Sequence, residues 1–419
     1  MEHFHYQDGE LLVEEVPARE LAARFGTPLY VYSHAALVGR VRAFRAAFGA
    51  ANPLVAYSVK ANPNLAVIAA LAAEGAGADV VSLGELQRAL TAGVPPERVV
   101  FAGVGKRPDE LEAALAAGIL QLNVEVEAEL EALDRLGRAR GRPAPVALRV
   151  NPDVAVKTHR YIQTGRRVDK FGVPLARARE VLRRAAALPG LRVVGVACHI
   201  GSQILELDPF RAALLRVREL VLELRRDGVA LERIDVGGGL GVRYRDEAPP
   251  SLADYARTVL DAVGDLGCAL CAEPGRAIVA NAGALLTRVL YRKEVGEKRF
   301  LIVDAAMNDL ARPSLYDAFH DIWPGSAAGG RVVADVVGPI CETGDFLARD
   351  REVPDVAAGD LLAGMSAGAY GRSMSSNYNS RPRAAEVLVR GAEAHLIGER
   401  EPLASLWAHE RIPEFLRRS

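Results

Sequence analysis

The chain has 419 residues, half of them apolar and a quarter charged, and its formal net charge is -1 at pH 7. A chain of this length can bury its own core, and its near-zero charge argues against a nucleic-acid or anionic-membrane partner. The first residues lack the basic and apolar pattern of a secretory signal, and no apolar run approaches the roughly 18 to 20 residues of a membrane span. We therefore expect a cytoplasmic protein whose partner is a small molecule or a second copy of itself.

Short elements come first along the chain. Apolar runs predict strands at residues 10–16 and 29–32, and helical spacing predicts a helix between them, from Pro17 to Phe25, that ends at Gly26. Ser33 can cap a following helix that runs to about Phe48. These elements precede a long, regular part of the chain.

From residue 54 onward, short apolar runs alternate with amphipathic stretches. Strands are predicted at 54–59, 77–83, 99–104, 120–126, 146–151, 193–199, 233–236 and 268–273. Helices are predicted at 64–73, 84–92, 108–117, 126–140, 175–188, 209–226 and 251–263. Eight buried strands alternating with helices predict a closed parallel (β/α)8 barrel, because the alternative, a doubly wound open sheet, usually has fewer strands. The long connection at 152–172 is expected to be a lid or an interface.

Beyond Gly275 the helical alternation stops. Strands are predicted at 284–291, 299–303, 331–337, 360–363, 386–389 and 395–397, which indicates an all-β sandwich or barrel. The two N-terminal strands have no place in a closed barrel and are expected to join this β domain. The expected domains are thus a barrel at 33–274 and a discontinuous β domain made of 1–32 and 275–419.

Lys60 follows the first barrel strand and is followed at once by turn residues. In such barrels the chemistry lies where strands end. An ammonium in an apolar site loses hydration, which favours the neutral, nucleophilic amine that Schiff-base chemistry needs. The alternative interpretation is an ordinary solvated lysine at a strand end.

Other polar residues stand at the ends of later strands: Asn151, His199, Gly237, Gly238, Gly239, Glu273, Gly275 and Arg276. Three glycines expose backbone N–H groups that can hold a phosphate, although they can equally form a tight turn. A histidine can stack on a ring or be a satisfied core residue. A carboxylate placed against a pyridine nitrogen can keep that nitrogen protonated, or it can simply be solvated. Together with a lysine, these groups describe a pyridoxal-phosphate site.

The four cysteines include a C-x-x-C at Cys268 and Cys271. A tetrahedral zinc site would need a second pair, so these are interpreted as structural thiols and no metal is expected.

A series of motifs runs in order along nearly the whole chain. They are FGTPLYVY (25–32), YSVKAN (57–62), HIGSQ (199–203), DVGGG (235–239), EPGR (273–276), RPSLY (312–316), CETGD (341–345) and GAYG (368–371). In this order they resemble the motifs of the diaminopimelate decarboxylases, pyridoxal-phosphate enzymes of fold type III in which a barrel is joined to a β domain. That family commonly has serine where Thr343 stands.

The resemblance implies a role for each matching residue. Lys60 would bind pyridoxal 5′-phosphate covalently, His199 would stack on its ring and Glu273 would meet its pyridine nitrogen. The phosphate would be held by Ser202, Gly237, Gly238, Gly239, Gly275, Arg276 and Tyr370. Substrate would be bound by Arg276, Arg312, Tyr316, Glu342 and Tyr370.

The implied reaction is decarboxylation of meso-diaminopimelate to L-lysine, the last step of lysine biosynthesis by the diaminopimelate route. Cys341 would supply the proton that replaces CO2, and Cys341 and Glu342 would come from the partner subunit of a homodimer. Two alternatives stay open: a decarboxylase of arginine, ornithine or carboxynorspermidine, and a non-catalytic pyridoxal-phosphate carrier or pseudo-enzyme.

Overall fold

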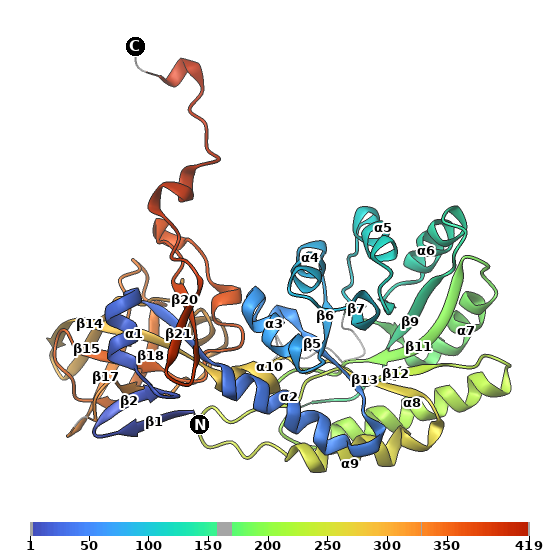
Figure 1. Ribbon diagram of the computed structural model, residues 1–419, viewed down its shortest axis with the longest axis horizontal. Coiled ribbons are helices and arrows are strands. Elements are labelled where there is room, and N and C mark those ends of the chain that lie inside the picture. Colours follow the sequence, from blue (N-terminus) through green and yellow to red (C-terminus); the bar gives the residue numbers. More distant parts are fainter. Residues whose placement is uncertain (1–2, 157–169, 328, 418–419) are drawn as a thin grey trace. The chain divides into compact units, whose positions relative to one another are not determined.

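The computed structural model describes residues 3–156, 170–327 and 329–417, so most of the expected lid or interface at 152–172 lies outside the described residues. The chain divides into two compact units (Figure 1). One, the barrel unit, is Ala36–Asn281; the other, the β unit, combines Met1–Ala35 with Ala282–Ser419. The boundaries predicted from the sequence, after residues 32 and 274, stay a prediction about which segments fold independently.

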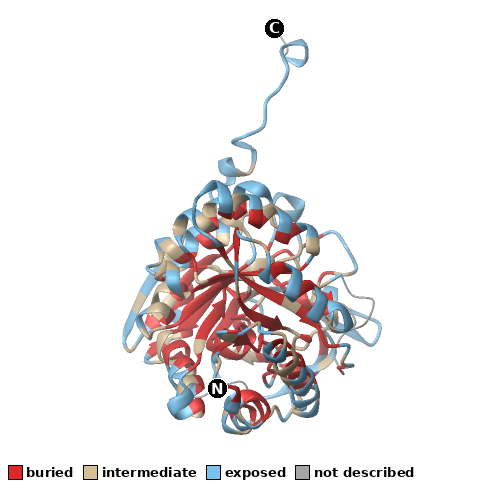
Figure 2. Cartoon of the chain, turned by 90° about the vertical axis from the view of Figure 1, so that its right-hand side faces the viewer, coloured by how far each residue is buried: buried red, intermediate tan, exposed pale blue. Residues whose placement is uncertain are grey.

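Parallel strands close the barrel unit. Their order is β9-β11-β12-β13-β5-β6-β7-β8, and β8 also pairs with β9, which confirms the predicted (β/α)8 barrel. The strands are β5 (Leu54–Ser58), β6 (Gly77–Val80), β7 (Val99–Phe101), β8 (Gln121–Val124), β9 (Ala144–Asn151), β11 (Leu191–Cys198), β12 (Arg233–Asp235) and β13 (Ala269–Ala272), with β10 (Val173–Pro174) beside β9. Figure 2 shows these strands buried within the surrounding helices.

Amphipathic helices cover the barrel. They are α2 (His34–Phe48), α3 (Leu65–Ala73), α4 (Leu83–Thr91), α5 (Pro108–Ala117), α6 (Glu127–Ala139), α7 (Leu175–Ala186), α8 (Asp208–Arg226), α9 (Leu252–Val263) and α10 (Arg276–Val279). Polar side chains cap several N-termini: Asn64 accepts from the N–H of Ala66, and Ser251 accepts from the N–H of Asp254. No helix in the described ranges is both long and apolar enough to cross a bilayer.

The β unit is built on a sheet of order β18-β17-β15-β14-β4-β20-β21, with β16 and β19 paired beside β14. Its strands are β4 (Leu29–Ser33), β14 (Gly283–Val295), β15 (Lys298–Val303), β16 (Ile322–Pro324), β17 (Arg331–Val337), β18 (Phe346–Pro354), β19 (Leu361–Gly364), β20 (Ala385–Arg390) and β21 (Glu393–Gly398). Because β4 lies between β14 and β20, the unit is discontinuous, as expected. Strand β18 was not predicted, since its middle, Arg349–Glu352, is a run of charged residues.

The expected strand at 10–16 is two strands, β2 (Glu10–Val13) and β3 (Val16–Pro17), separated by a turn in which Glu14 has a φ of 52°. With β1 (Phe4–Gln7) they form a small antiparallel sheet. Helix α1 (Ala18–Phe25) follows, and the apolar residues of these elements share a core with β4, β14 and β20. The short helix α11 (Arg312–Tyr316) completes the unit.

Helix α6 packs so closely on the loop before β11 that it needs a glycine. A Cβ on Gly137 would lie 2.0 Å from the backbone O of Gly190, whereas a Cβ on Gly39 of helix α2 would meet nothing within 4 Å. We predict opposite effects of two Gly→Ala substitutions. Gly39→Ala should stabilise by about 0.5–1 kcal/mol through helix propensity, and Gly137→Ala should destabilise by about 1–3 kcal/mol through overpacking.

Urea unfolding midpoints of the two variants, compared with that of the unsubstituted protein, test this pair. A midpoint for Gly137→Ala that rises as it does for Gly39→Ala would show that the close approach of helix and loop is not present in solution.

Candidate functional site

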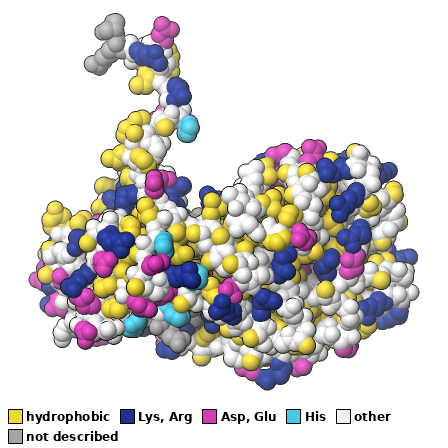
Figure 3. Space-filling view, in the orientation of Figure 1, with side chains coloured by type: hydrophobic (Ala, Val, Ile, Leu, Met, Phe, Trp, Pro, Cys, Tyr) yellow, Lys and Arg dark blue, Asp and Glu magenta, His cyan; other side chains and the backbone are white. Residues whose placement is uncertain are grey.

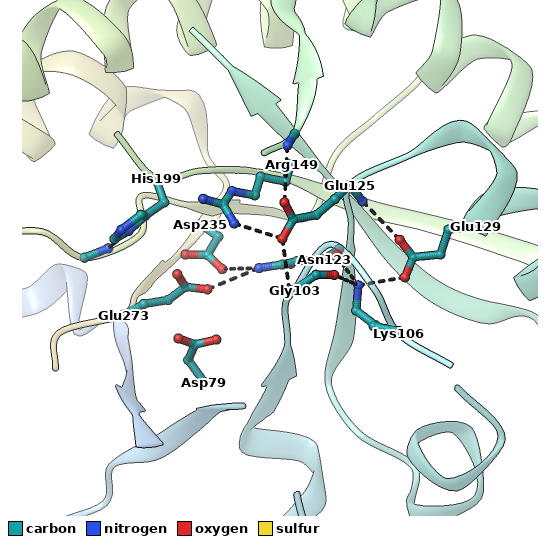
Figure 4. A network of polar contacts seen from close by, with 12 residues as sticks. Asp79, Gly103, Lys106, Asn123, Glu125, Glu129, Arg149, His199, Asp235 and Glu273 are labelled. Atoms are coloured by element: carbon teal, nitrogen blue, oxygen red, sulfur yellow. Dashed lines mark hydrogen bonds and ion pairs between the residues drawn. The ribbon is translucent and has the colours of Figure 1, made fainter. Parts of the chain in front are cut away.

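Polar side chains gather at the carboxyl ends of the barrel strands, where the sequence predicted the chemistry. Lys60 lies in the turn Val59–Ala61 after β5. Asp79 lies on β6, Asp235 ends β12 and Glu273 follows β13 (Figure 4). These strands adjoin one another in the order β12-β13-β5-β6. The parallel sheet therefore brings residues from distant parts of the sequence together at the opening of the barrel where its strands end, here called the barrel mouth.

Lys60 pairs with a buried carboxylate. Its Nζ lies 2.8 Å from Oδ2 of Asp79, whose side chain is fully buried, while 37% of the Lys60 side chain is exposed. Ser58 Oγ also donates to Asp79 Oδ2, at 2.8 Å. The expected apolar surroundings of Lys60 are wrong, because a carboxylate supplies the charge that favours an ammonium.

Glu273 and Asp235 form a buried carboxyl pair. Asn123 Nδ2 lies 3.2 Å from Oε1 of Glu273 and 3.1 Å from Oδ2 of Asp235, and Gln121 Nε2 donates to the amide oxygen of Asn123 at 2.9 Å. Burial, reinforced by the charges of Asp235 and Asp79, raises the pKa of Glu273 well above its ordinary value. Burial likewise raises the pKa of Asp235. The raised pKa of Glu273 favours a proton held between the two carboxyl groups, which a basic nitrogen could accept.

His199 follows β11 and lies across the same mouth (Figure 4). Its Nδ1 accepts a hydrogen bond of 3.1 Å from the N–H of Gly238. Desolvation, helped by the positive charges of Arg149 and Lys60, holds the pKa of His199 well below its ordinary value. The ring is therefore a neutral, flat group, as stacking requires.

Three glycines form the turn after β12 because no side chain fits there. A Cβ on Gly238 would lie 2.1 Å from the carbonyl O of Glu273, and one on Gly239 would lie 2.4 Å from that of Gly201. Gly237 and Gly239 also have φ values of 68° and 106°, which favour glycine. Two of the N–H groups of this turn are already used, that of Gly237 by Asp235 Oδ1 at 3.0 Å and that of Gly238 by His199 Nδ1.

Beside this turn, Arg276 begins α10 and is itself buried. Its guanidinium donates to Ser202 Oγ at 3.1 Å and to the hydroxyl of Tyr244 at 2.6 Å. The nearby Gly275 packs against Ser58, whose Cβ would lie 3.0 Å from an added Cβ. Arg276 and Ser202 therefore supply side-chain donors that are suited to an anion.

A second polar network lies next to the first and was not predicted. Arg149 Nη1 lies 2.8 Å from Glu125, and Lys106 Nζ lies 2.7 Å from Glu129 (Figure 4). Lys106 also donates to the carbonyl O of Asn123 at 2.7 Å, and its side chain is 1% exposed. Lys106 is thereby fixed as a structural cation that supports the strand carrying Asn123.

Asp79 and Asn123 are site residues that reasoning from the sequence missed. Both lie inside predicted strands, at 77–83 and 120–126, with apolar residues on either side of them. A polar residue within a buried strand needs a partner, and this was the available signal. Asn151, by contrast, was singled out at a strand end, and its side chain accepts from the N–H of Asp153 in a local turn.

The remaining predicted residues belong to the β unit. Arg312 is buried, and its Nη1 lies 2.8 Å from Nε2 of His320. Cys341 and Glu342 are exposed in a loop that Asp345 holds by accepting from the N–H groups of Met307 and Ile340, both at 2.7 Å. The predicted residues therefore divide into a barrel set (Lys60, His199, Ser202, Gly237, Gly238, Gly239, Glu273, Gly275 and Arg276) and a β-unit set (Arg312, Tyr316, Cys341, Glu342 and Tyr370).

The two residues of the C-x-x-C motif are free thiols, and Cys271 is buried on β13. In the ranges that the structure describes, no cluster of three or more His, Cys, Asp or Glu side chains is arranged to hold a metal ion.

Comparison with known proteins identifies the family. The family model "Pyridoxal-dependent decarboxylase, pyridoxal binding domain" matches residues 34–280. A diaminopimelate decarboxylase of Pseudomonas aeruginosa is 52% identical over 98% of this chain and 99% of its own, and one of Vibrio cholerae is 50% identical over 98% and 99%.

Solved structures give the same result. The diaminopimelate decarboxylase of Helicobacter pylori complexed with L-lysine has a TM-score of 0.91 and 42% identity, covering 94% of this chain and 98% of its own. That of M. jannaschii in co-complex with L-lysine has a TM-score of 0.94 and 37% identity, covering 99% of both chains. The chain therefore belongs to the diaminopimelate decarboxylase family of pyridoxal-dependent decarboxylases.

Proposed function

We propose that this protein decarboxylates meso-diaminopimelate to L-lysine and CO2 with pyridoxal 5′-phosphate, in the cytoplasm and as a homodimer. The observation that carries the proposal is the barrel mouth in which Lys60 lies 2.8 Å from Asp79, with the buried carboxyl of Glu273 beside them. Two relatives of this chain are described as complexes with L-lysine, the product of that reaction.

The residues present fit the cofactor. Oδ1 of Asp79 is buried and has no hydrogen-bond partner among the described residues, and Glu273 is a buried carboxyl with a raised pKa. Both features would suit a site that takes up a positively charged ring nitrogen and, next to it, a carbon bonded to Lys60. When bound, the cofactor supplies an electron sink for the pair of electrons left by departing CO2.

In the barrel unit each residue has a defined task. Lys60 would hold the cofactor covalently, and Asp79 Oδ2 is within reach to accept the proton that Nζ must lose before it acts as a nucleophile. Glu273 would keep the ring nitrogen protonated, with Asp235 beside it. His199, which accepts from the N–H of Gly238, would stack on the ring.

The phosphate end is assigned to the glycine turn and to Arg276. Gly237, Gly238, Gly239 and Gly275 would let the backbone come close to the phosphate because they carry no side chain, and Ser202, Arg276 and Tyr370 would add side-chain donors. Arg276 also serves the substrate.

The β unit supplies the rest of the substrate site. Arg312 pairs with the distal carboxylate, with Tyr316 and Tyr370 beside it, and Glu342 binds the distal ammonium. The bond between Cα and the carboxylate breaks, its electron pair returns to Cα, and the thiol of Cys341 delivers the proton that completes L-lysine. Cys341 and Glu342 are proposed to act in the site of the partner subunit.

The substrate is tested by CO2 release from a panel of amino acids. We expect turnover of meso-diaminopimelate and little or none of lysine, ornithine or arginine, because only the first offers a distal carboxylate to Arg312. Arg312→Ala should lower kcat/KM by more than tenfold, since a charge-assisted contact is worth about 1.5–3 kcal/mol. Arg331→Ala, an exposed arginine of the same unit, is the control and should change nothing. Equal turnover of lysine by the unsubstituted protein would refute the assignment.

The proton on the ring nitrogen is tested by Glu273→Gln. The amide cannot deliver a proton, so kcat should fall on the order of 100-fold, about 2.7 kcal/mol, while the affinity for pyridoxal phosphate is kept. Steady-state kinetics measure kcat, and titration with pyridoxal phosphate measures the affinity for the cofactor. Glu232→Gln, at an exposed carboxylate outside the barrel mouth, should behave as the unsubstituted protein. An unchanged kcat for Glu273→Gln would remove this role.

Sharing of the site between subunits is tested by mixing two inactive variants, Lys60→Ala and Cys341→Ala. With free exchange, half of the dimers are heterodimers, and each holds one intact site and one with both defects. Activity should therefore recover to roughly a quarter of all sites. Each variant incubated alone is the control. If exchange occurs without recovery, the two residues act from the same chain.

A further inference from the structure

Residues 402–417, here called the apolar arm, follow a firmly held anchor. Glu401 accepts from the backbone N–H of Arg383 at 2.9 Å and from Nδ2 of Asn377 at 2.6 Å. Arg400 Nη2 donates to the carbonyl O of Pro28 at 2.7 Å. These bonds tie the start of the arm to the β unit.

Beyond this anchor the arm bonds only to itself among the described residues. Its turns are closed by local bonds such as Ser405 N–H to the O of Pro402, at 3.0 Å, and Leu416 N–H to the O of Pro413, also at 3.0 Å. No hydrogen bond, ion pair or ring contact within the described ranges joins it to the rest of the chain. Among the described residues, the conformation of the arm is therefore not fixed by hydrogen bonds or ion pairs to the rest of the chain.

Large apolar side chains are exposed along the arm. The exposed fractions are 61% for Leu403, 55% for Trp407, 64% for Ile412, 84% for Phe415 and 61% for Leu416. Figure 3 shows hydrophobic side chains on this segment. Together they present on the order of 600 Å² of apolar surface, more than isolated exposed residues of a monomer normally do, and such patches mark interaction sites.

The arm is also conformationally restricted. Pro402 (φ -62°, ψ 138°) and Pro413 (φ -57°, ψ 150°) are extended and precede the short 3-10 turns Leu403–Trp407 and Glu414–Leu416. Proline fixes φ, so the arm loses little conformational entropy when it docks. Preformed turns with exposed aromatic residues are suited to binding a protein surface.

We propose that the apolar arm docks on a second copy of this chain, each copy giving its arm to the other. Reciprocal exchange doubles the area that each partner buries, which then exceeds the roughly 800 Å² per partner of a stable interface. Every copy carries the arm, so a second copy is always present in equal amount. A lipid surface is disfavoured, because the charged residues are of both signs (Glu410, Arg411, Glu414 and Arg417) and there is no long basic amphipathic helix.

The proposal is tested without measuring turnover, so its outcome is separate from that of the decarboxylase assignment. The chain has two tryptophans, Trp323 and Trp407, and in the full-length Trp323→Phe protein the emission reports Trp407 alone. We expect emission that is blue-shifted and protected from acrylamide at micromolar concentration and that shifts to the red on dilution into monomer. Exposed emission from an intact dimer, or protected emission that does not depend on concentration, would overturn the proposal.

Sedimentation of full-length variants gives the second measurement. Trp407→Ser combined with Leu416→Ser should raise the dissociation constant of the dimer more than tenfold while circular dichroism stays that of the folded protein, because neither side chain packs in a core. The matched control is Leu215→Ser, an exposed leucine of α8. An unchanged dissociation constant for the arm variant, or an equal rise for the control, would contradict docking of the arm on a second copy.

Discussion

The barrel mouth depends on the burial of the carboxyl groups of Asp79, Asp235 and Glu273, the last two of which Asn123 joins by hydrogen bonds. Charges of the same sign in a site with little water repel one another, and together with burial this raises the pKa values of Glu273 and Asp235. Lys60 offsets part of the remaining charge through Asp79. Such an arrangement costs stability in an empty barrel and becomes favourable when positive charge enters the mouth, which is the usual sign of a functional site.

In the adjoining network of Glu125, Glu129, Arg149 and Lys106, every carboxylate has a cationic partner. Glu125 is matched by Arg149 and Glu129 by Lys106, and each carboxylate also accepts from a backbone N–H group, that of Gly103 or that of Glu125. A buried ion pair with its hydrogen bonds satisfied fixes geometry, and it is costly to disrupt by removing one partner. The two networks therefore have different roles. The ion pairs of Glu125 and Glu129 hold strands and loops in place, and the Glu273–Asp235 pair, with its raised pKa values, is available for chemistry.

In the β unit, the loop that carries Cys341 and Glu342 is held in shape by hydrogen bonds to backbone groups. Asp345, the last residue of the CETGD motif, accepts from two N–H groups and so orients Cys341 and Glu342 without contacting either thiol or carboxylate. Ser314 adds a 2.5 Å bond to the carbonyl O of Gly344 and joins the α11 segment to the same loop. A motif can thus combine residues assigned to chemistry with residues that only shape the loop.

Much of this protein follows from its sequence alone. The alternation of apolar runs and amphipathic stretches determined the (β/α)8 barrel, because each buried strand must be covered by a helix, and the motifs determined the family and the strand-end residues Lys60, His199 and Glu273. Strand β18 could not be predicted, because its charged residues lie on a strand that is only partly buried.

Only the tertiary structure decided which polar residues meet. Asp79, Asn123 and Asp235 lie on separate strands, and the closure of the sheet brings them to Lys60 and Glu273. The raised pKa of Glu273 and the negative charge of Asp79 next to Lys60 depend on those neighbours and on burial, which are properties of position in space. The order of residues along the chain specifies the strands, and the distances between their ends decide the chemistry.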